Sequence, residues 1–411
     1  MKVKATPDPP ARQGTTMTDH APPALDFDGL RPPSPFMTPA HEAWRSRLRG
    51  FVDGYIAPHL DQWDAASDFP DSLYQDAARE GISGMGFRED LGGTGENIDL
   101  WDRIIFAEEF FRMGSGVVFA DLATPWIALP PIINGGTPEM LDRVARPVLA
   151  GERKIAFAVT EPGGGSDVSG FTTTAERKGD VFIVNGGKTL ISGAMKADYL
   201  LTAVRTGGPG MGGLSMLLIE TDRPGVTRGP LLGLQWYNRN NGWLNFDNVE
   251  VPVTNLVGVE NRGFAGLASQ FNIERFSGIA ATLAMTRTCV AEAIAFARER
   301  QTFGKRLIDH QVMRHKIVDM VQRIKVAYAM LDILVWRFGR GEVPVADLAL
   351  LKVQATTTLE HCARESLQVL GGRAYTGGNR VERIYREARI FVIGGGSEEI
   401  LRDLAAKQMG F

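Results

Sequence analysis

Residues 157–167 of the chain read Phe-Ala-Val-Thr-Glu-Pro-Gly-Gly-Gly-Ser-Asp. An apolar run from Ile155 alternates into Thr160 and then breaks at Pro162 and three glycines, which predicts a short strand that leads into a loop. Glycines let backbone N–H groups approach a ligand closely, and Thr160 and Ser166 add hydroxyl donors. Such a loop suits a phosphate or a flat heterocycle with acceptor edges. A plain connection between two strands is the alternative.

The residues that follow this loop continue in the alternating pattern of strands. Val181 to Val184, Asn185-Gly186 and Thr189 to Ser192 together predict a β-hairpin, because Asn-Gly suits a turn with positive φ. Further strands are predicted at 199–204, 214–219 and 243–251. The middle of the chain is therefore expected to form a small antiparallel β domain.

Helical periodicity lies on both sides of this β region. Residues from His41 to about Arg153 are predicted to be helical, and long helices are predicted at about 266–300, 310–338 and 346–371, with a last one that begins near Ser397. Residues 1–35 are rich in Pro, Ala, Thr and Asp, which predicts a disordered leader, and Met17 is a second candidate start.

Composition excludes several classes of function. The chain has 411 residues, of which 44% are apolar and 23% charged, and this predicts two or three globular domains. A net charge of −3 gives no reason to expect nucleic acid or an anionic membrane as a partner. Cys289 and Cys362 lie in apolar helical segments and are expected to be buried thiols. The six histidines show no metal-ligand spacing, and no membrane span or signal peptide is visible, so a cytoplasmic protein without a metal centre is expected.

Three further glycine-containing motifs lie outside the opening stretch. Residues 208–213 match the pattern G-x-G-x-x-G, but they link two predicted antiparallel strands and are expected to form a hairpin loop. Arg300-Gln301-Thr302-Phe303-Gly304 follows a long helix, with Gly304 as the expected helix end. Arg300 could hold a pyrophosphate or simply complement the helix dipole. Residues 394–399 place three glycines before a Ser cap, so this turn is either an anion site or an ordinary capped helix.

Taken together in this order, the motifs resemble the acyl-CoA dehydrogenase family from about residue 41 to 411. The resemblance rests on residues 158–167, Asn185-Gly186-x-Lys188, Arg300 to Gly304, Gln368-Val369-Leu370-Gly371-Gly372 and the turn at 394–397. It implies an α+β fold with an N-terminal helical domain (36–154), a middle antiparallel β domain (155–260) and a C-terminal four-helix bundle (261–411). It also implies a homotetramer, an acyl-CoA substrate of fatty acid β-oxidation, and an electron-transferring flavoprotein as electron acceptor.

The resemblance further implies FAD as the cofactor, bound between the β domain and the bundle and completed by a neighbouring subunit. Thr160 and Ser192 would offer hydroxyls to the flavin, and Arg300 with the segment from Gln368 would hold the pyrophosphate and adenosine across the dimer. Asn272, Arg275, Ser166 and Gly395 would contact the substrate. The full implied cofactor set is Phe157, Val159, Thr160, Gly165, Ser166, Leu190, Ile191, Ser192, Arg300, Gln301, Thr302, Phe303, Gln311, Gln368, Val369, Gly371, Gly372, Gly396, Ser397 and Glu399.

The chain departs from the common family pattern at the catalytic base. Most members carry a glutamate at the position of Gly395, which here can offer only its backbone N–H. A minority, including isovaleryl- and long-chain acyl-CoA dehydrogenases, carries the base on a bundle helix in a Glu-Arg pair, which matches Glu274-Arg275. We therefore expect Glu274 to remove the α-proton, which requires a carboxylate of raised pKa and a polarised carbonyl. The alternative for Glu274 is an ordinary surface glutamate.

Other departures affect the flavin and nucleotide contacts. Leu190 replaces the usual tryptophan beside the flavin, and Arg239-Asn240-Asn241 replaces the Ser-Asp-Thr that usually contacts the nucleotide end of CoA. Two competing functions remain open: a flavin oxidase or monooxygenase that acts on a substrate without CoA, and a non-catalytic partner that has lost its base.

Overall fold

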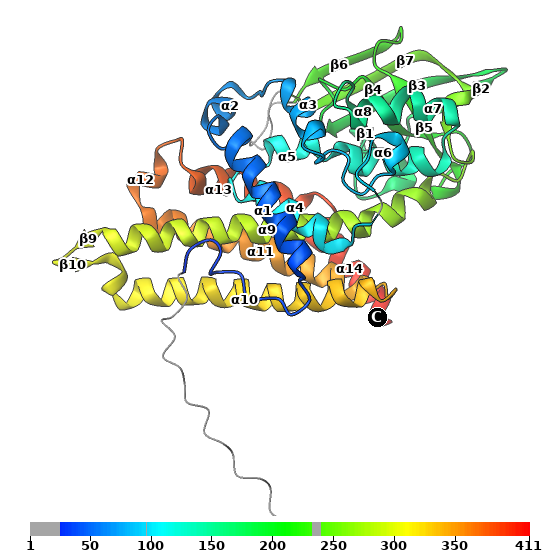
Figure 1. Ribbon diagram of the computed structural model, residues 1–411. Helices are drawn as coiled ribbons and strands as arrows, with labels where there is room; N and C mark the ends of the chain where they lie inside the picture. Colours follow the sequence, from blue (N-terminus) through cyan, green and yellow to red (C-terminus); the bar gives the residue numbers. More distant parts are fainter. Residues whose placement is uncertain (1–24, 96, 232–239) are drawn as a thin grey trace, which may run out of the picture.

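The computed structural model describes residues 25–95, 97–231 and 240–411, and for residues 117 and 264–271 it describes the backbone alone. Residues 239–241 stand where the family usually has a motif that contacts the nucleotide end of CoA. Of these three, the structure describes only Asn240 and Asn241, and both are buried. A helical N-terminal region, a β-sheet and a long helical bundle follow one another along the chain (Figure 1).

The N-terminal region consists of short helices that begin with clear capping signals. Thr38 caps the first helix and Asp99 caps the fourth, each by accepting a hydrogen bond from the backbone two or three residues on. The apolar faces of these helices share one core with the inner face of the sheet. The helices are α1 (Pro39–Phe51), α2 (Leu60–Ala66), α3 (Ser72–Arg79), α4 (Leu100–Phe111), α5 (Val117–Leu122), α6 (Thr124–Gly135), α7 (Pro138–Met140) and α8 (Arg146–Leu149).

Residues 25–35 do not form part of a disordered leader. Leu30 is completely buried, Leu25 and Phe27 pack against the bundle, and Arg31 pairs with the buried carboxylate of Glu108 at 3.1 Å. The expectation was wrong for these residues because a few large apolar side chains and one paired arginine suffice to fix the segment. Residues 1–24 lie outside the described part of the chain.

The middle region is one mixed sheet in the order β6-β7-β3-β2-β4-β5-β8, in which β1 also pairs with β4. Most neighbours are antiparallel, as expected, but β1 runs parallel to β4, and β2 touches β4 in parallel at one position. The strands are β1 (Ile155–Ala158), β2 (Thr174–Lys178), β3 (Val181–Ile191), β4 (Tyr199–Arg205), β5 (Leu214–Glu220), β6 (Val226–Pro230), β7 (Gly242–Pro252) and β8 (Leu256–Val257).

The predicted hairpin at Asn185-Gly186 is wrong. Strand β3 continues through both residues and carries a β-bulge against β7 between Val184 and Gly186. Gly186 has φ +136°, and a Cβ there would lie 2.7 Å from the Cα of Thr173. The glycine therefore serves a bulge with a close backbone approach, not a turn. By contrast, the glycine-rich segment 208–213 joins antiparallel β4 and β5, as predicted.

The C-terminal region is built on three long helices, of which α9 runs from beneath the sheet to the far end of the molecule (Figure 1). Helix α13 was not predicted, although Asn379 caps it and Val381, Ile384, Ala388 and Phe391 form its buried face. The elements are α9 (Gly263–Glu299), β9 (Gln301–Thr302), β10 (Lys305–Arg306), α10 (Gln311–Gly339), α11 (Val345–Leu370), α12 (Gly372–Tyr375), α13 (Arg380–Ile393) and α14 (Glu398–Met409).

Helix α9 supplies much of the bundle core. Residues Asn272–Glu299 are long and apolar enough to cross a membrane by length and composition, which the sequence reading overlooked, but 78% of that window is buried inside the protein. A core helix passes the same test. Cys289 on this helix and Cys362 on α11 are both buried free thiols, as predicted.

Candidate active site

The glycine-rich loop that follows β1 is fixed to the end of β3. Within the loop, Glu161 and Gly164 exchange two backbone hydrogen bonds of 3.1 Å, and Thr160 accepts a 2.9 Å bond from the backbone N–H of Thr189. These bonds bring the predicted segment 157–166 beside the predicted segment 190–192. The resemblance implied that both segments face one cofactor; the structure places them side by side, and their role in cofactor binding stays a prediction.

A buried ion pair between Lys188 and Glu161 lies behind the surface formed by residues 157–166 and 190–192, which we call the wall. The Nζ of Lys188 donates to Glu161 Oε1 and to the carbonyl of Val159, both at 2.9 Å, while Glu161 also accepts the backbone N–H groups of Thr172 and Thr173. Burial lowers the pKa of Lys188 to about 8. For Glu161, burial acts to raise the pKa, but the bonds from Lys188 and Thr172 outweigh it and hold the pKa at about 2. The pair gives both residues, which occur in motifs of the resemblance, a structural role in the buried interior.

The open side of the wall offers unused hydroxyls and an exposed apolar side chain. Thr160 and Ser192 are half-buried, and their hydroxyls bond to no other group in the described part of the chain. Leu190 is 58% exposed and has φ +57°, which is rare for a branched residue and costs about 1–3 kcal/mol. A flat heterocycle that covers Leu190 and accepts from the two hydroxyls fits this surface.

Glu274 lies on α9, eleven residues from its start near the sheet. Its side chain keeps part of its accessible surface, yet burial raises the pKa of its carboxyl above the ordinary range, and Arg275 only partly opposes that shift. A carboxylate that is desolvated but still reachable is suited to act as a base toward a bound molecule.

Arg275, the next residue, is only partly satisfied by the protein. Its Nη1 donates to Asn272 Oδ1 at 2.9 Å, while its buried Nε has no hydrogen-bond partner in the described residues. Burial lowers the pKa of Arg275, and the charge of Glu274 acts in the opposite direction. An anionic or carbonyl-bearing substrate would complete this donor set.

The turn between α13 and α14 carries the glycine that replaces the common base. Gly395 has φ +67°, and a Cβ built there would meet nothing within 4 Å. Ser397 caps α14 by accepting from the backbone N–H of Ile400, as predicted, and Glu399 lies in the exposed first turn. Gly395 therefore presents backbone, and not a carboxylate, to an open space.

Lys352 on α11 donates a hydrogen bond to this turn, and it was not among the site residues predicted from the sequence. Its Nζ donates to the carbonyl of Gly396 at 2.7 Å, and the charges of Glu398 and Arg275 act on its pKa. A signal was available, because Lys352 shares the 3/4 spacing of buried Leu348, Leu351 and Ala355 on one helix face. A lysine in such a core position is uncommon unless it has a partner.

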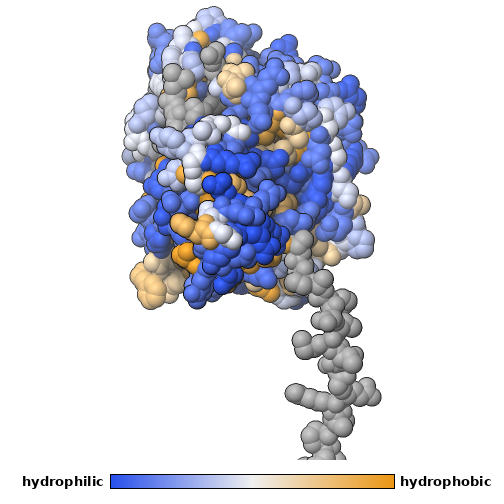
Figure 2. All heavy atoms as spheres, turned by 90° about the vertical axis from the view of Figure 1, so that its left-hand side faces the viewer, coloured by the Kyte–Doolittle hydropathy of each residue, from blue (hydrophilic) through white to orange (hydrophobic). Residues whose placement is uncertain are grey.

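The second half of the predicted cofactor set lies at the other end of the bundle. Helix α9 ends at Glu299, not at Gly304, and Phe303-Gly304 form the two-residue turn of the β9–β10 hairpin with φ +50° and +78°. Phe303 is 97% exposed. Viewed from this end, the surface is largely hydrophilic with separate apolar patches (Figure 2).

One chain does not bring the two halves of the set together. The hairpin and α12 lie at the end of the bundle opposite the sheet (Figure 1). Residues of this second half are mostly exposed, namely Arg300, Gln301, Gln311, Gln368, Gly371 and Gly372, while Thr302 is half-buried and Val369 is buried. The two halves of the predicted cofactor set are therefore far apart within one chain.

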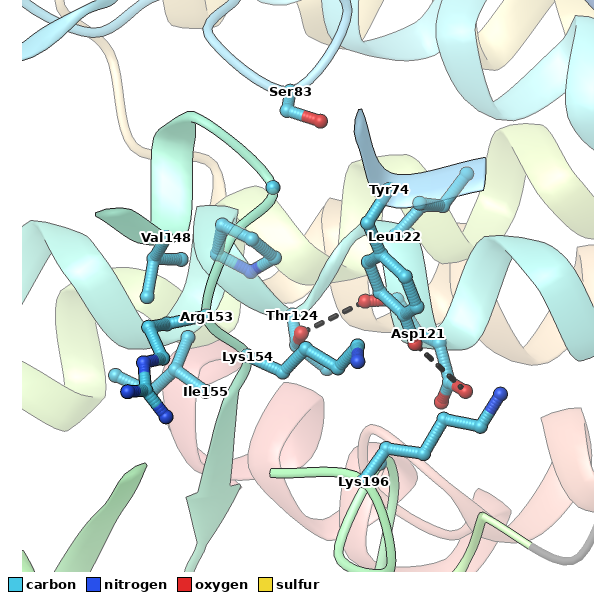
Figure 3. Close-up of a pocket in the computed structure, with 13 residues that line it drawn as sticks. Tyr74, Ser83, Asp121, Leu122, Thr124, Val148, Arg153, Lys154, Ile155 and Lys196 are labelled. Carbon is cyan, nitrogen blue, oxygen red and sulfur yellow. Dashed lines mark hydrogen bonds between the residues drawn. The ribbon is translucent and has the colours of Figure 1, made fainter. Parts of the chain in front are cut away.

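Two hollows elsewhere do not match the predicted site. A cavity of about 10 Å³ lies where the helical region meets the sheet, with Tyr74 donating to Asp121 and Thr124 donating to the Asp121 carbonyl (Figure 3). It has room for about one water. A hollow of about 610 Å³ is lined by Arg31, Arg45, Arg49 and Arg287, whose charges are opposed by Glu108, Glu109, Asp28 and Glu42.

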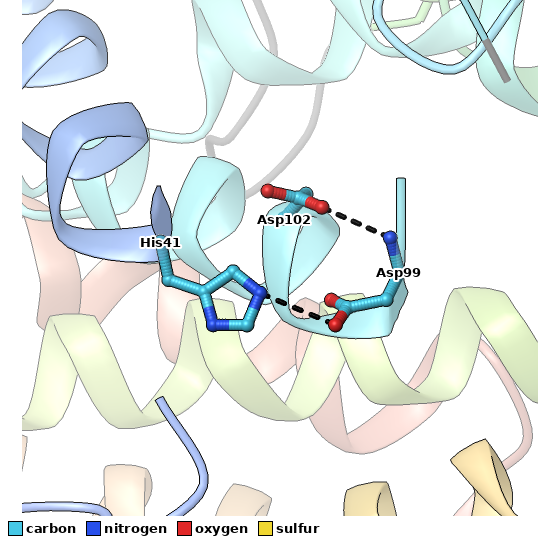
Figure 4. Close-up of side chains that lie close together, drawn as sticks. All are labelled: His41, Asp99 and Asp102. Carbon is cyan, nitrogen blue, oxygen red and sulfur yellow. Dashed lines mark hydrogen bonds and ion pairs between the residues drawn. The ribbon is translucent and has the colours of Figure 1, made fainter. Parts of the chain in front are cut away.

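His41, Asp99 and Asp102 lie close enough to share a cation (Figure 4). Each is already used by helix capping: His41 Nδ1 accepts from Thr38 at 3.0 Å, Asp99 accepts from Trp101 at 2.7 Å, and Asp102 accepts from Asp99 at 2.9 Å. His41 Nε2 completes the group with a 3.2 Å contact to Asp99. Capping accounts for all three side chains.

Comparison with known proteins identifies the fold and the family. Models of the N-terminal, middle and C-terminal domains of acyl-CoA dehydrogenases match residues 38–152, 156–249 and 261–410. The chain belongs to the acyl-CoA dehydrogenase family. Its members are FAD-dependent oxidoreductases that act on CH–CH bonds, and this chain is an enzyme of that class with the three-domain fold.

Individual relatives cover nearly the whole chain. An acyl-CoA dehydrogenase of Alternaria alternata, AFT10-1, is 37% identical over 90% of this chain and 91% of its own length. A crystal structure described as a probable acyl CoA dehydrogenase from Mycobacterium abscessus has a TM-score of 0.87 at 39% identity and covers 91% of this chain and 100% of that one. A subunit of the caffeyl-CoA reductase–Etf complex of Acetobacterium woodii is 30% identical over 87% of this chain and 94% of its own.

Proposed function

We propose that this acyl-CoA dehydrogenase removes the α-proton and the β-hydride of an acyl-CoA thioester to give a trans-2-enoyl-CoA, with Glu274 as the base. The observation that carries the proposal is the state of Glu274, which is desolvated enough to have a raised pKa and is still accessible on α9. The ordinary position for a base, Gly395, has no side chain.

The α-proton of a thioester is weakly acidic, so the base must be strong when the carbonyl is polarised. Desolvation makes the Glu274 carboxylate a better proton acceptor, and closure over a substrate increases that effect. The backbone N–H of Gly395 stabilises the negative charge that develops on the thioester oxygen. Arg275, with its unpartnered Nε, positions the substrate on the same helix.

FAD accepts the hydride when it is bound. Thr160 and Ser192 would donate to its ring edge, Leu190 would cover its face, and Glu161 with Lys188 would keep that wall in place from behind. The nucleotide end would extend to Arg300, Gln301 and the Gln368–Gly372 segment of a second subunit.

We also propose that the chain assembles into a homo-oligomer through α10. This helix exposes Val318 and Val326 at 63% and 56%, and Ile333 and Trp336 lie farther along it with 48% and 43% exposed. An apolar stripe of this kind on a soluble bundle favours burial against another subunit. The separation of the two halves of the cofactor set within one chain supports the same assembly.

The base is tested by anaerobic titration of the purified holoenzyme with a panel of acyl-CoA thioesters of medium, long and branched chains. Wild type is expected to bleach its flavin absorbance with at least one of them, and Glu274→Gln to bleach at least about 1,000-fold more slowly with FAD still bound. Glu299→Gln, at the exposed end of the same helix, is the matched control. Bleaching of Glu274→Gln at the rate of this control would refute the assignment.

The same titration separates the competing functions. Slow reoxidation by oxygen, together with fast reoxidation by an electron-transferring flavoprotein, supports a dehydrogenase, whereas fast reaction with oxygen supports an oxidase. The likeness to the caffeyl-CoA reductase subunit makes the reverse reaction a second candidate, in which Glu274 returns the proton to Cα. Oxidation of the reduced enzyme by an enoyl-CoA under anaerobic conditions measures that direction.

A further inference from the structure

Lys352 is a buried cation at the candidate active site. It lies in the first third of α11 with 5% of its surface exposed, and its Nζ donates to the carbonyl of Gly396 at 2.7 Å and to that of Val392 at 3.5 Å. Val392 O is among the last carbonyls of α13, which lack a partner within their own helix. The ammonium thus bridges the end of α13 and the turn that follows it.

The turn needs a stabilising hydrogen bond from outside because three consecutive glycines have little intrinsic preference for one conformation. Gly395 and Gly396 have φ +67° and +106°, and Gly394 is held by a backbone bond to Ile390 at 2.7 Å. Among the described residues, Lys352 is the side chain outside the turn that donates to residues 394–396. Its removal would leave the peptide between Gly396 and Ser397, next to Gly395, without this hydrogen bond.

The surrounding charges are arranged around this ammonium. The charges of Arg275 on α9 and Glu398 on α14 act on it, while α13 contributes the Val392 carbonyl. Burial lowers the pKa of Lys352 to about 8; Glu398 opposes that shift, and Arg275 adds to it. A leucine would fill the same position without a desolvation cost, so stability alone gives no reason for a lysine there.

We propose that Lys352 is a positioning residue that fixes the Gly394–Gly396 turn, so that the backbone N–H of Gly395 points at the thioester carbonyl. Lys352 does not touch the reacting atoms. It acts through the peptide that it holds, and its ammonium keeps the oxyanion donor in place before the substrate binds. The proposal rests on the proposed function, because it concerns the carbonyl-polarising half of the same site.

The experiment compares Lys352→Met, which removes the donor, with Lys352→Gln, which keeps an uncharged donor. Lys178→Met, on exposed β2 and away from α10, is the control. In holoenzyme at pH 7, Lys352→Met is expected to lower kcat about 10- to 100-fold with KM changed less than about threefold, on the scale of losing one oxyanion donor. Hydrogen–deuterium exchange of the 393–400 backbone should accelerate in Lys352→Met while the flavin content stays at the wild-type level.

A pH profile separates positioning from a structural role. Wild-type kcat should fall above pH 8, where Lys352 loses its proton, toward the level of Lys352→Gln, and that alkaline step should be absent from both variants. Wild-type kcat and wild-type exchange in Lys352→Met would overturn the proposal, as would an unchanged alkaline step in Lys352→Gln. Should Lys352→Met fail to fold, the Gln variant alone decides. Hydrogen–deuterium exchange of residues 393–400 is measured without turnover. A failure of the proposed chemistry is therefore distinguishable from a failure of the Lys352–Gly396 hydrogen bond to hold the turn.

Discussion

In the proposed function, Glu274 and the backbone of Gly395 share the roles that one glutamate would have at position 395 in most of this family. The carboxylate is on a helix, and the turn retains only its backbone donor, with open space where a side chain would begin. The residue types of this arrangement were accessible from the sequence, because Gly395 and Glu274 each fall at a matched position. The desolvation of Glu274 was not predictable from the sequence, because it depends on packing against helices that are distant in the sequence.

Moving the base tests that division of roles. The double variant Glu274→Gln with Gly395→Glu is expected to recover at least about tenfold activity over Glu274→Gln, because a Cβ at 395 meets nothing within 4 Å. Recovery should be incomplete, since a side chain at φ +67° costs about 1–3 kcal/mol. Single-turnover flavin reduction measures it. No gain over Glu274→Gln would mean that position 395 does not face the α-carbon.

The pKa of Glu387 gives a pH-dependent prediction for stability. Burial raises it to about 8 in the folded protein, and the backbone N–H of Gly116, at 2.9 Å from Oε2, only partly opposes this shift. The unfolded chain therefore loses this proton at lower pH than the folded protein does. The contribution of Glu387 to stability is fully present below about pH 4.5 and is lost as pH rises through about 8.

Glu387→Gln, which cannot ionise and can still accept from Gly116, should remove that loss. Urea unfolding at pH 5 and pH 8.5 is expected to give a smaller difference in the free energy of unfolding for the variant than for wild type. Glu382→Gln, on the same helix but paired with Arg386, is a control. Equal pH dependence of wild type and Glu387→Gln would contradict the assigned pKa.

At the scale of elements, the ion pair of Lys188 and Glu161 joins β3 to the loop after β1 and to residues 172–173. Lys188→Met should destabilise the protein by about 3–5 kcal/mol, because Glu161 would keep a buried charge without its partner. Flavin content should fall with it, since the wall would lose its support. Lys178→Met, on exposed β2, should change stability by less than about 0.5 kcal/mol.

Chemical denaturation and flavin absorbance measure both effects of Lys188→Met. An unfolding midpoint and a bound-flavin content equal to those of Lys178→Met would show that the Lys188–Glu161 pair does not support this wall. The strand β1 and the loop after it were predicted correctly from the sequence. Strand β3 was wrongly predicted as a hairpin, because Asn-Gly has the same local signature in a turn and in a bulge. Only the pairing with β7 distinguishes the two.

Across the whole molecule, the three-domain order was predictable from the separated motifs, whereas the distances between them were not. The flavin wall lies at the sheet end of α9 and the Arg300 hairpin lies at the other end, a separation set by the length of that helix (Figure 1). If both halves bind one cofactor, as we propose, a second subunit has to supply the half that lies at the far end of the bundle.

Disruption of the apolar stripe on α10 tests this requirement. Val318→Glu with Val326→Glu is expected to convert the oligomer to smaller species and to lower FAD retention, because the nucleotide end loses the second subunit. Light scattering coupled to size-exclusion chromatography and the flavin-to-protein absorbance ratio measure the two outcomes. Lys178→Glu, a change of the same charge on exposed β2 and away from α10, is the control. Monomers with full flavin would contradict the shared site.

The most direct test of the central claim is exchange of the α-proton of a bound acyl-CoA with deuterated solvent, measured by mass spectrometry of the recovered thioester. We expect exchange by wild type and by Glu299→Gln, and exchange at least about 1,000-fold slower by Glu274→Gln with its FAD retained. Exchange by Glu274→Gln at the wild-type rate would show that another group removes the proton.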